Sequence, residues 1–245
     1  MHWSEINLNP DNLEVVRFRN EKVESTYRPS IDSYEHLVQQ VCVGKRVIDF
    51  GGANHSAETQ SISESNTHDL VVKHSFNVTG VDLVEFCNIC PEKCSHFIGD
   101  FLTAQTFPFA KADVIFAGHV IEHLASPYQL FEFAEKQLND LGRLVIVTPN
   151  PLWFMGLFFR SLGKNNSVNA DHVAIFGASE LIELGARYGF EIVEWAYSGR
   201  ADMSHEFRPG GRVLSRVINI LYRISRVTNL AFSHNQIVAI FERSN

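Results

Sequence analysis

The sequence predicts an α/β fold built on a doubly wound, mostly parallel sheet, and two observations support this prediction. Seven short segments are rich in β-branched residues and alternate little with polar ones, as parallel strands buried on both faces should. Helical patterns lie between several of these segments, which is the element order of a doubly wound sheet. The predicted strands cover residues 46–50, 76–81, 95–98, 114–117, 143–147, 191–195 and 236–241.

Three helices are predicted from apolar residues at helical spacing, over residues 33–41, 124–138 and 179–188. Residues 139–142 (Asn-Asp-Leu-Gly) end the second helix with turn chemistry, and Gly189 stands where the third helix should stop. Residues 1 to about 30 are polar and carry no clear period, so we expect a surface arm there.

Length and composition favour one α/β domain with a modest addition, because 45% of the 245 residues are hydrophobic and 20% are charged. We expect an N-terminal arm at 1–35, a core at 36–198, a helical insertion or lid at 199–235 and the last strand of the core sheet at 236–245. The net charge of −7 argues against bulk electrostatic binding to nucleic acid. No basic segment followed by an apolar run opens the chain, and no stretch approaches the ~20 apolar residues of a membrane span, so we expect a cytoplasmic, reducing location.

Small and acidic residues stand just after the predicted strands, at the carboxyl ends where open α/β sheets bind ligands. Small residues let the backbone approach a ligand closely, and a carboxylate can accept both hydroxyl hydrogens of a ribose. Five such strand ends together are far more specific than any one of them. They are Asp49-Phe50-Gly51-Gly52-Ala53-Asn54, Val81-Asp82-Leu83, Gly99-Asp100-Phe101, Ala117 to Leu124, and Thr148-Pro149-Asn150-Pro151.

With these stretches the chain resembles the class I S-adenosylmethionine (SAM)-dependent methyltransferases, over about residues 36–195 and the last strand. It is most similar to bacterial methyltransferase-domain proteins related to the type 11 and type 23 groups, in which the first motif runs on into a His-Ser pair, here His55-Ser56, before a long loop. The resemblance implies a Rossmann-like, seven-stranded sheet with an antiparallel last strand. It also implies that SAM is the cofactor and that methyl transfer is the activity.

The resemblance further implies which strand-end residues contact SAM. Asp49 and Gly51 would line the methionine part of SAM, and Asp82 would bind the ribose. Asp100 and Phe101 would hold the adenine, and Ala117, Gly118 and His119 would close over the sulfonium. Gly52, Ala53 and Leu83 would also contact the cofactor. The family's loop usually carries three glycines at alternate positions, whereas here only Gly51 fits and Ala53 and His55 fill the other two. This departure keeps a non-catalytic SAM-binding protein as an alternative. A nicotinamide-dependent oxidoreductase is a further alternative, disfavoured because the GxGxxG pattern is absent.

Catalytic candidates come from His119, Glu122 and His123, which share one helical face, and from His172 further along the chain. Because SAM is already activated, the enzyme mainly aligns the reactants, and a general base helps when the acceptor is a hydroxyl. One interpretation makes His123 or His172 a base or orienting group beside Glu122, a second gives the cluster only a capping or packing role, and a third makes it a divalent metal site.

The metal interpretation has a family precedent. A Glu-x-x-Glu-His pattern with a later histidine resembles the metal site of small-RNA 2′-O-methyltransferases and ubiquinone-pathway O-methyltransferases, but His119 replaces the first glutamate here. We therefore do not favour a metal at this cluster.

Cysteines form a second pattern of interest. Cys87, Cys90, Cys94 and His96 have ligand-like spacing just after the second predicted strand. Zinc sites usually pair two CxxC-like turns and only one is present, so we favour ordinary thiols.

Two apolar features concern the methyl acceptor. Residues 151–159 follow the fifth predicted strand and are too apolar for a plain exposed loop. Residues 211–230 predict an amphipathic helix, which either packs on the core or lies on an anionic membrane surface. Its basic side carries Arg212, Arg216, Arg223 and Arg226. We expect a small-molecule, glycan or lipid-linked acceptor, methylated at oxygen, with peripheral membrane contact through 211–230 left open.

Overall fold

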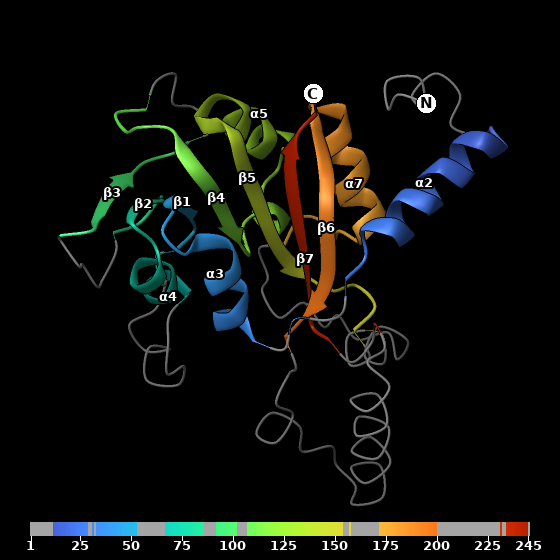
Figure 1. The fold of residues 1–245 in the computed structure, drawn as a ribbon, viewed down its shortest axis with the longest axis horizontal. Helices are drawn as coiled ribbons and strands as arrows, with labels where there is room; N and C mark the ends of the chain where they lie inside the picture. Colours follow the sequence, from blue (N-terminus) through green and yellow to red (C-terminus); the bar gives the residue numbers. More distant parts are fainter. Residues whose placement is uncertain are drawn as a thin grey trace, which may run out of the picture.

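One mixed seven-stranded sheet, in the order β3-β2-β1-β4-β5-β7-β6, forms the centre of the protein (Figure 1). The computed structural model describes residues 12–28, 31, 33–52, 67–85, 92–101, 107–153, 157, 172–199, 231 and 234–244. The strands are β1 (Arg46–Phe50), β2 (Asn77–Asp82), β3 (Cys94–Ile98), β4 (Ala112–Gly118), β5 (Leu138–Pro149), β6 (Phe190–Ser198) and β7 (Gln236–Arg243). The helices are α2 (Leu13–Thr26), α3 (Tyr34–Cys42), α4 (Thr67–His74), η2 (Ile121–His123), α5 (Tyr128–Gln137) and α7 (Ala178–Arg187).

Strand β7 runs against its neighbours in the sheet. β1 pairs in parallel with β2 and β4, β2 pairs in parallel with β3, and β4 with β5. β7 lies between β5 and β6 and is antiparallel to both. The predicted Rossmann-like, doubly wound sheet with an antiparallel last strand is therefore confirmed. Because β1 has β2 on one side and β4 on the other, the strand order reverses there, and such switch points open a crevice at the carboxyl ends of the strands.

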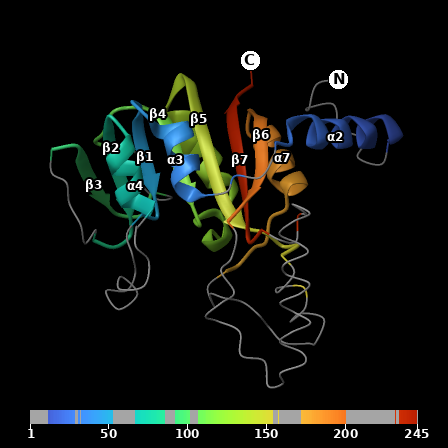
Figure 2. The same ribbon diagram turned by 60° about the horizontal axis from the view of Figure 1, so that its bottom comes forward.

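Successive apolar residues of the central strands point to opposite faces of the sheet, and both faces are buried. Val47 and Val114 pack in a cluster with α3 and α4, whereas Ile48 and Ile115 pack in a cluster with α5 and α7. Figures 1 and 2 show helices on both sides of the sheet. Burial on both faces explains why hydrophobic and polar residues alternate so little along these strands.

Helix α5 begins later than the predicted helix over 124–138, because Pro127 is its N-cap and a proline disfavours helical backbone in the residue before it. The short 3₁₀ helix η2 lies before the predicted range. The turn predicted at 139–142 lies within β5 instead. There the pairing jumps from Ala112–Leu138 to Val114–Arg143, and Leu141 is 95% exposed. Helix α5 does end just before these residues, at Gln137, but they form a bulge in the strand pairing and not a free turn.

The N-terminal segment contains helix α2, where the sequence analysis expected a surface arm without periodic structure. The helix contacts α7 and β6 (Figure 1). The Trp195 indole Nε1 donates to the Val23 carbonyl at 2.7 Å, and Arg19 forms an ion pair with Glu183. Apolar periodicity missed this helix because few of its side chains are buried. Its partners lie 172 and 164 positions further along the chain.

Several predictions fall on residues that the structure does not describe. They concern Ala53, the His55-Ser56 pair, Cys87, Cys90, most of 151–159 and the helix expected over 211–230. The domain boundaries near 35, 198 and 235 stay predictions. Among the described helices, none has the length and apolar character needed to cross a membrane.

Candidate active site

A pocket of about 170 Å³ opens at the ends of β1 and β4, where the strand order reverses. It is lined by Asp49, Phe50, Gly51, Gly52, Thr67, Gly118 and His119. A larger open cavity of about 810 Å³ is lined in part by Arg46 and Asn77, which begin β1 and β2. Because open α/β sheets bind ligands at the carboxyl ends of their strands, the smaller pocket is the candidate cofactor site.

Two glycines let the loops of this pocket pack closely. Gly51 has φ +67°, and its amide donates to the Val81 carbonyl at 3.0 Å. A Cβ at Gly51 would lie 2.7 Å from Val120 Cγ2, and a Cβ at Gly118 would lie 2.6 Å from the Tyr34 hydroxyl oxygen. The sequence analysis attributed these small residues to ligand approach, and the structure adds that the protein's own packing requires them.

The buried Asp49 carboxylate is paired with His68, which lies on α4 in a region that the sequence analysis treated as a long loop. Asp49 Oδ2 lies 2.7 Å from His68 Nδ1, and the two side chains are 1% and 2% exposed. Burial alone would lower the pKa of His68, but the hydrogen bond and charge of Asp49, with a contact from Cys94, raise it to about 9. Burial raises the pKa of Asp49 despite this partner.

The end of β2 carries the predicted ribose-binding residues. Asp82 is buried, and its Oδ1 accepts a hydrogen bond from the Val84 amide at 3.2 Å. Leu83 beside it is 67% exposed, and Asp100 beyond the end of β3 is also exposed. The structure thus places the two predicted carboxylates at the carboxyl edge of the sheet, one buried and one open to solvent.

Two other predicted cofactor residues are partly committed to packing. The Phe101 ring is half-buried and its centroid lies 4.5 Å from that of Phe50. Ala117 is completely buried in the core and does not line the pocket.

His119 organises a hydrogen-bond network at the mouth of the pocket. It has φ 59°, which residues other than glycine rarely adopt, and its side chain is 40% exposed. Its Nδ1 lies 3.1 Å from Glu122 Oε1, and its Nε2 lies 2.9 Å from the Gln236 amide nitrogen. Since that amide donates, Nε2 accepts and Nδ1 donates to Glu122.

Glu122 is a buried carboxylate with both oxygens engaged. Its Oε2 accepts from the Thr148 hydroxyl at 3.0 Å, in addition to the bond from His119 to Oε1. Burial alone would raise the pKa of Glu122, but its hydrogen bonds with His119 and Thr148 hold that pKa below its usual range.

The structure brings the three predicted catalytic residues together. The rings of His123 and His172 meet edge to face with centroids 4.7 Å apart. The amides of Val173 and Ala174 both donate to the Glu122 carbonyl, which holds the His172 segment against η2. One carboxylate oxygen of Glu122 and one ring nitrogen each of His123 and His172 all lie within 4.8 Å of one another.

A family model described as a methyltransferase domain matches residues 21–195 of the chain. The chain belongs to this methyltransferase family. The matched region contains every residue of the pocket and all three predicted catalytic residues. The protein is a SAM-dependent methyltransferase, so the predicted activity and cofactor are confirmed, and the nicotinamide-dependent alternative has no support.

Solved structures share the fold of the methyltransferase at low sequence identity. A SAM-dependent methyltransferase from Archaeoglobus fulgidus is 17% identical, with a TM-score of 0.52 over 86% of this chain and 95% of that one. The 1,6-didemethyltoxoflavin-N1-methyltransferase of Burkholderia thailandensis is 13% identical, with a TM-score of 0.51 over 87% and 79%. The [4+2]-cyclase SpnF is 14% identical, with a TM-score of 0.50 over 86% and 80%. A comparison with curated protein sequences finds no match.

Sequence reasoning missed four residues of the methyltransferase's site, namely Thr67, His68, Thr148 and Gln236. Thr148 stood in a quoted strand end but was not selected. Gln236 begins the antiparallel β7 and therefore lies at the edge where the parallel strands end. Because the last strand was expected to be antiparallel, its first residue could have been predicted to lie near the site.

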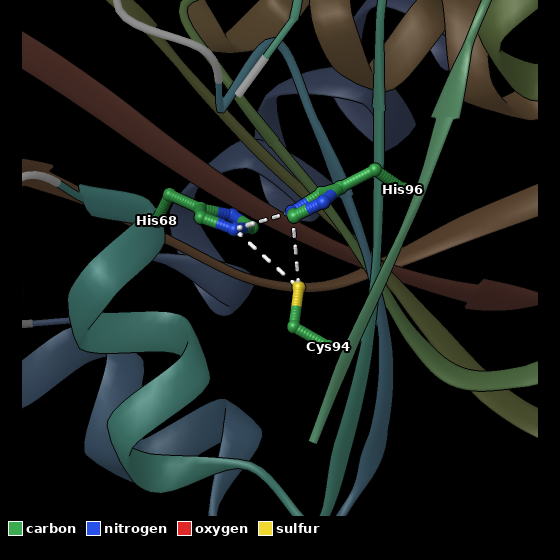
Figure 3. Close-up of side chains that lie close together, drawn as sticks. All are labelled: His68, Cys94 and His96. Carbon is green, nitrogen blue, oxygen red and sulfur yellow. Dashed lines mark hydrogen bonds between the residues drawn. The ribbon is translucent and has the colours of Figure 1, made fainter. Parts of the chain in front are cut away.

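Two members of the cysteine-histidine motif lie on β3 of the methyltransferase, beside the Asp49–His68 pair. Figure 3 shows Cys94 and His96 pointing toward His68 from across the space between β3 and α4. Cys94 Sγ lies 3.2 Å from His96 Nε2 and 3.6 Å from His68 Nε2.

Proposed function

We propose that this methyltransferase transfers the methyl group of SAM to an oxygen atom of its acceptor, with His123 or His172 receiving the proton that the oxygen loses. The observation that supports this most is the convergence of Glu122, His123 and His172 beyond the end of β4. His119 lines the pocket and also binds Glu122, so the histidine pair adjoins the candidate cofactor site.

The chemistry of the transfer explains why a base favours oxygen. In the in-line displacement, the bond from acceptor oxygen to methyl carbon forms as the sulfur–carbon bond breaks, and S-adenosylhomocysteine leaves. The hydroxyl proton must then pass to a base, and imidazole is the side chain most often used for this. A neutral amine attacks through a free lone pair and needs no base in that step.

We infer that the strand ends bind SAM in the roles that the family resemblance assigns. Asp82 and Asp100 lie at the carboxyl edge of the sheet, where they would bind the ribose and the adenine. The Asp49 carboxylate is already bound to His68, so Asp49 would shape the methionine end of the site mainly through its backbone and that pair.

Apolar side chains beside the histidine pair support an acceptor with an apolar part. Val173 and Ile175 follow His172 and are 63% and 56% exposed. The Val173 amide bonds to the Glu122 carbonyl, so this apolar segment lies against the proposed proton acceptors. A small-molecule or lipid-linked acceptor suits this surface better than a bare glycan.

Membrane contact through residues 211–230 stays a separate proposal. Flotation of the full chain with anionic liposomes tests it. Absence of binding, with and without SAM, would count against membrane contact.

Assays of SAM binding and turnover test the proposed residues separately. In calorimetry, Asp82→Ala should weaken SAM binding, and unchanged affinity would contradict the assigned ribose site. A panel of hydroxyl and amine acceptors should give products methylated on oxygen, identified by mass spectrometry. His123→Ala and His172→Ala should lower kcat by about 10²–10⁴-fold with SAM affinity unchanged.

His36→Ala provides the matched control, because His36 is an exposed histidine on α3. A product methylated on nitrogen or carbon, or full activity of the double histidine variant, would contradict the proposal. Tight SAM binding without turnover across the panel would favour the non-catalytic alternative.

A further inference from the structure

Three ligand-type side chains from α4 and β3 converge on one point that methyl transfer does not explain (Figure 3). Cys94 and His96 are alternate residues of the edge strand β3, so they project from the same face of the sheet. His68 faces them from the first turn of α4. His68 Nε2, Cys94 Sγ and His96 Nε2 form a triangle with sides of 3.2, 3.4 and 3.6 Å.

The sides of this triangle match the separations between ligands of tetrahedral zinc. Zinc–sulfur and zinc–nitrogen bonds of about 2.3 and 2.0–2.1 Å, at the tetrahedral angle, put sulfur and nitrogen about 3.6 Å apart and two nitrogens about 3.3 Å apart. The two sulfur–nitrogen separations are 3.6 and 3.2 Å, and the nitrogen–nitrogen separation is 3.4 Å. A hydrogen bond joins only two of these three atoms, whereas one metal ion can bond to all of them.

Asp49 supplies the outer partner that metal-bound histidines usually have. Its Oδ2 lies 2.7 Å from His68 Nδ1, which fixes the ring so that Nε2 points toward Cys94 and His96. A carboxylate on the far nitrogen of a ligating imidazole orients the ring and raises its basicity. The Asp49–His68 pair is thus the outer part of a carboxylate–histidine–metal arrangement.

We propose that His68, Cys94 and His96 bind one zinc ion, with Asp49 as the carboxylate behind His68. Thiolate and imidazole ligands select zinc over magnesium or calcium, which prefer oxygen. Cys94 and His96 are partly exposed, so a metal can enter from solvent and keep a water in its fourth position. The ion joins α4 to the edge strand β3 and, through Asp49, to the cofactor pocket, and this role is independent of the proposed acceptor chemistry.

Metal titration of the full-length protein tests the site. After treatment with a chelator, the folded protein should take up one equivalent of Zn²⁺. Co²⁺ should give the visible bands of a tetrahedral site with a sulfur-to-cobalt charge-transfer band. Cys94→Ser should abolish the charge-transfer band, and His68→Gln and Asp49→Asn should each weaken metal affinity about tenfold or more. Cys42→Ser and His36→Gln, which alter a thiol and an imidazole elsewhere, should behave as the parent protein.

Two results would overturn the proposal. One is failure of the folded parent protein to take up a stoichiometric metal ion, and the other is a cobalt spectrum that persists unchanged in Cys94→Ser. If that variant does not fold, alkylation of the parent protein decides the matter. Zn²⁺ should protect Cys94 from iodoacetamide in peptide mass spectrometry, and equal alkylation with and without Zn²⁺ would refute the site.

Discussion

Replacing Gly51 with alanine should destabilise the methyltransferase by about 2–5 kcal/mol, the sum of two separate costs. The first cost is backbone strain, because φ +67° is a left-handed conformation that costs an L-residue about 1–2 kcal/mol. The second is steric, because the new methyl would lie 2.7 Å from Val120 Cγ2, and overpacking a core typically costs about 1–3 kcal/mol. Against a total stability of about 5–15 kcal/mol, the loss is large.

Gly44 provides a control that separates the two costs. It has φ +69°, and a Cβ there would meet no atom within 4 Å. Gly44→Ala should therefore lower the free energy of unfolding through backbone strain alone. Adding Val120→Ala to Gly51→Ala removes the Val120 methyl that would clash, so the double variant should regain part of the steric loss. The two substitutions should then change the free energy of unfolding by less than the sum of their separate effects.

Urea unfolding followed by circular dichroism measures Gly51→Ala, Gly44→Ala, Val120→Ala and the Gly51→Ala/Val120→Ala double variant. We expect Gly51→Ala to lower the free energy of unfolding by about 1–3 kcal/mol more than Gly44→Ala does. Equal losses in the two single variants, or strict additivity of Gly51→Ala and Val120→Ala, would refute the packing argument.

Three further predictions concern buried polar groups elsewhere in the domain. Burial and the nearby Asp49 charge raise the pKa of Cys42 to about 12, so its thiol should react slowly in the folded protein. In a dithionitrobenzoate assay, Cys42→Ser should leave the number of fast-reacting thiols unchanged. In denaturant, the same variant should show one thiol fewer than the parent protein. Because the pKa of Glu122 is lowered in the folded state, its stabilising contribution is complete above its unfolded pKa of about 4.3 and is lost as pH falls. The unfolding free energy of the parent protein should therefore drop more steeply below about pH 5 than that of Glu122→Gln, and parallel pH profiles would contradict this. The Asn150 amide donates to the carbonyls of Ala231 and His234. Asn150→Ala should therefore lower the free energy of unfolding by about 1–3 kcal/mol per carbonyl left unsatisfied. A loss no larger than that of Asn20→Ala, at an exposed position, would be evidence against this.

The sheet was predictable because its signal is local. Strands buried on both faces must be apolar at nearly every position, so short runs such as Val47-Ile48 stand out without knowledge of their partners. Helix α2 lacks such a signal, because its contacts with Trp195 and Glu183 depend on residues far along the chain. Likewise, 139–142 carries turn residues that tertiary pairing accommodates within β5.

The candidate site divides in the same way. Gly51, Asp82 and Glu122 follow predicted strands, and the rule that ligands bind at strand ends selects them. His68 has no such marker, because its role arises only when α4 packs against β1 and β2 and brings it to Asp49 and Cys94. Distances between side chains on different elements are a property of packing, and spacing along the sequence does not contain them.

The inner position of β7 has a consequence for biosynthesis. This eight-residue strand lies between β5 and β6, and Arg143 of β5 pairs with Glu242 of β7. Until residues 236–243 have left the ribosome, β5 and β6 each present a row of unpaired backbone groups. Between the synthesis of β6 and the emergence of β7, the nascent methyltransferase therefore carries two open strand edges. A chain truncated before β7 keeps those edges and stays exposed to chaperones and proteases, which makes sheet closure a check on complete translation of the domain.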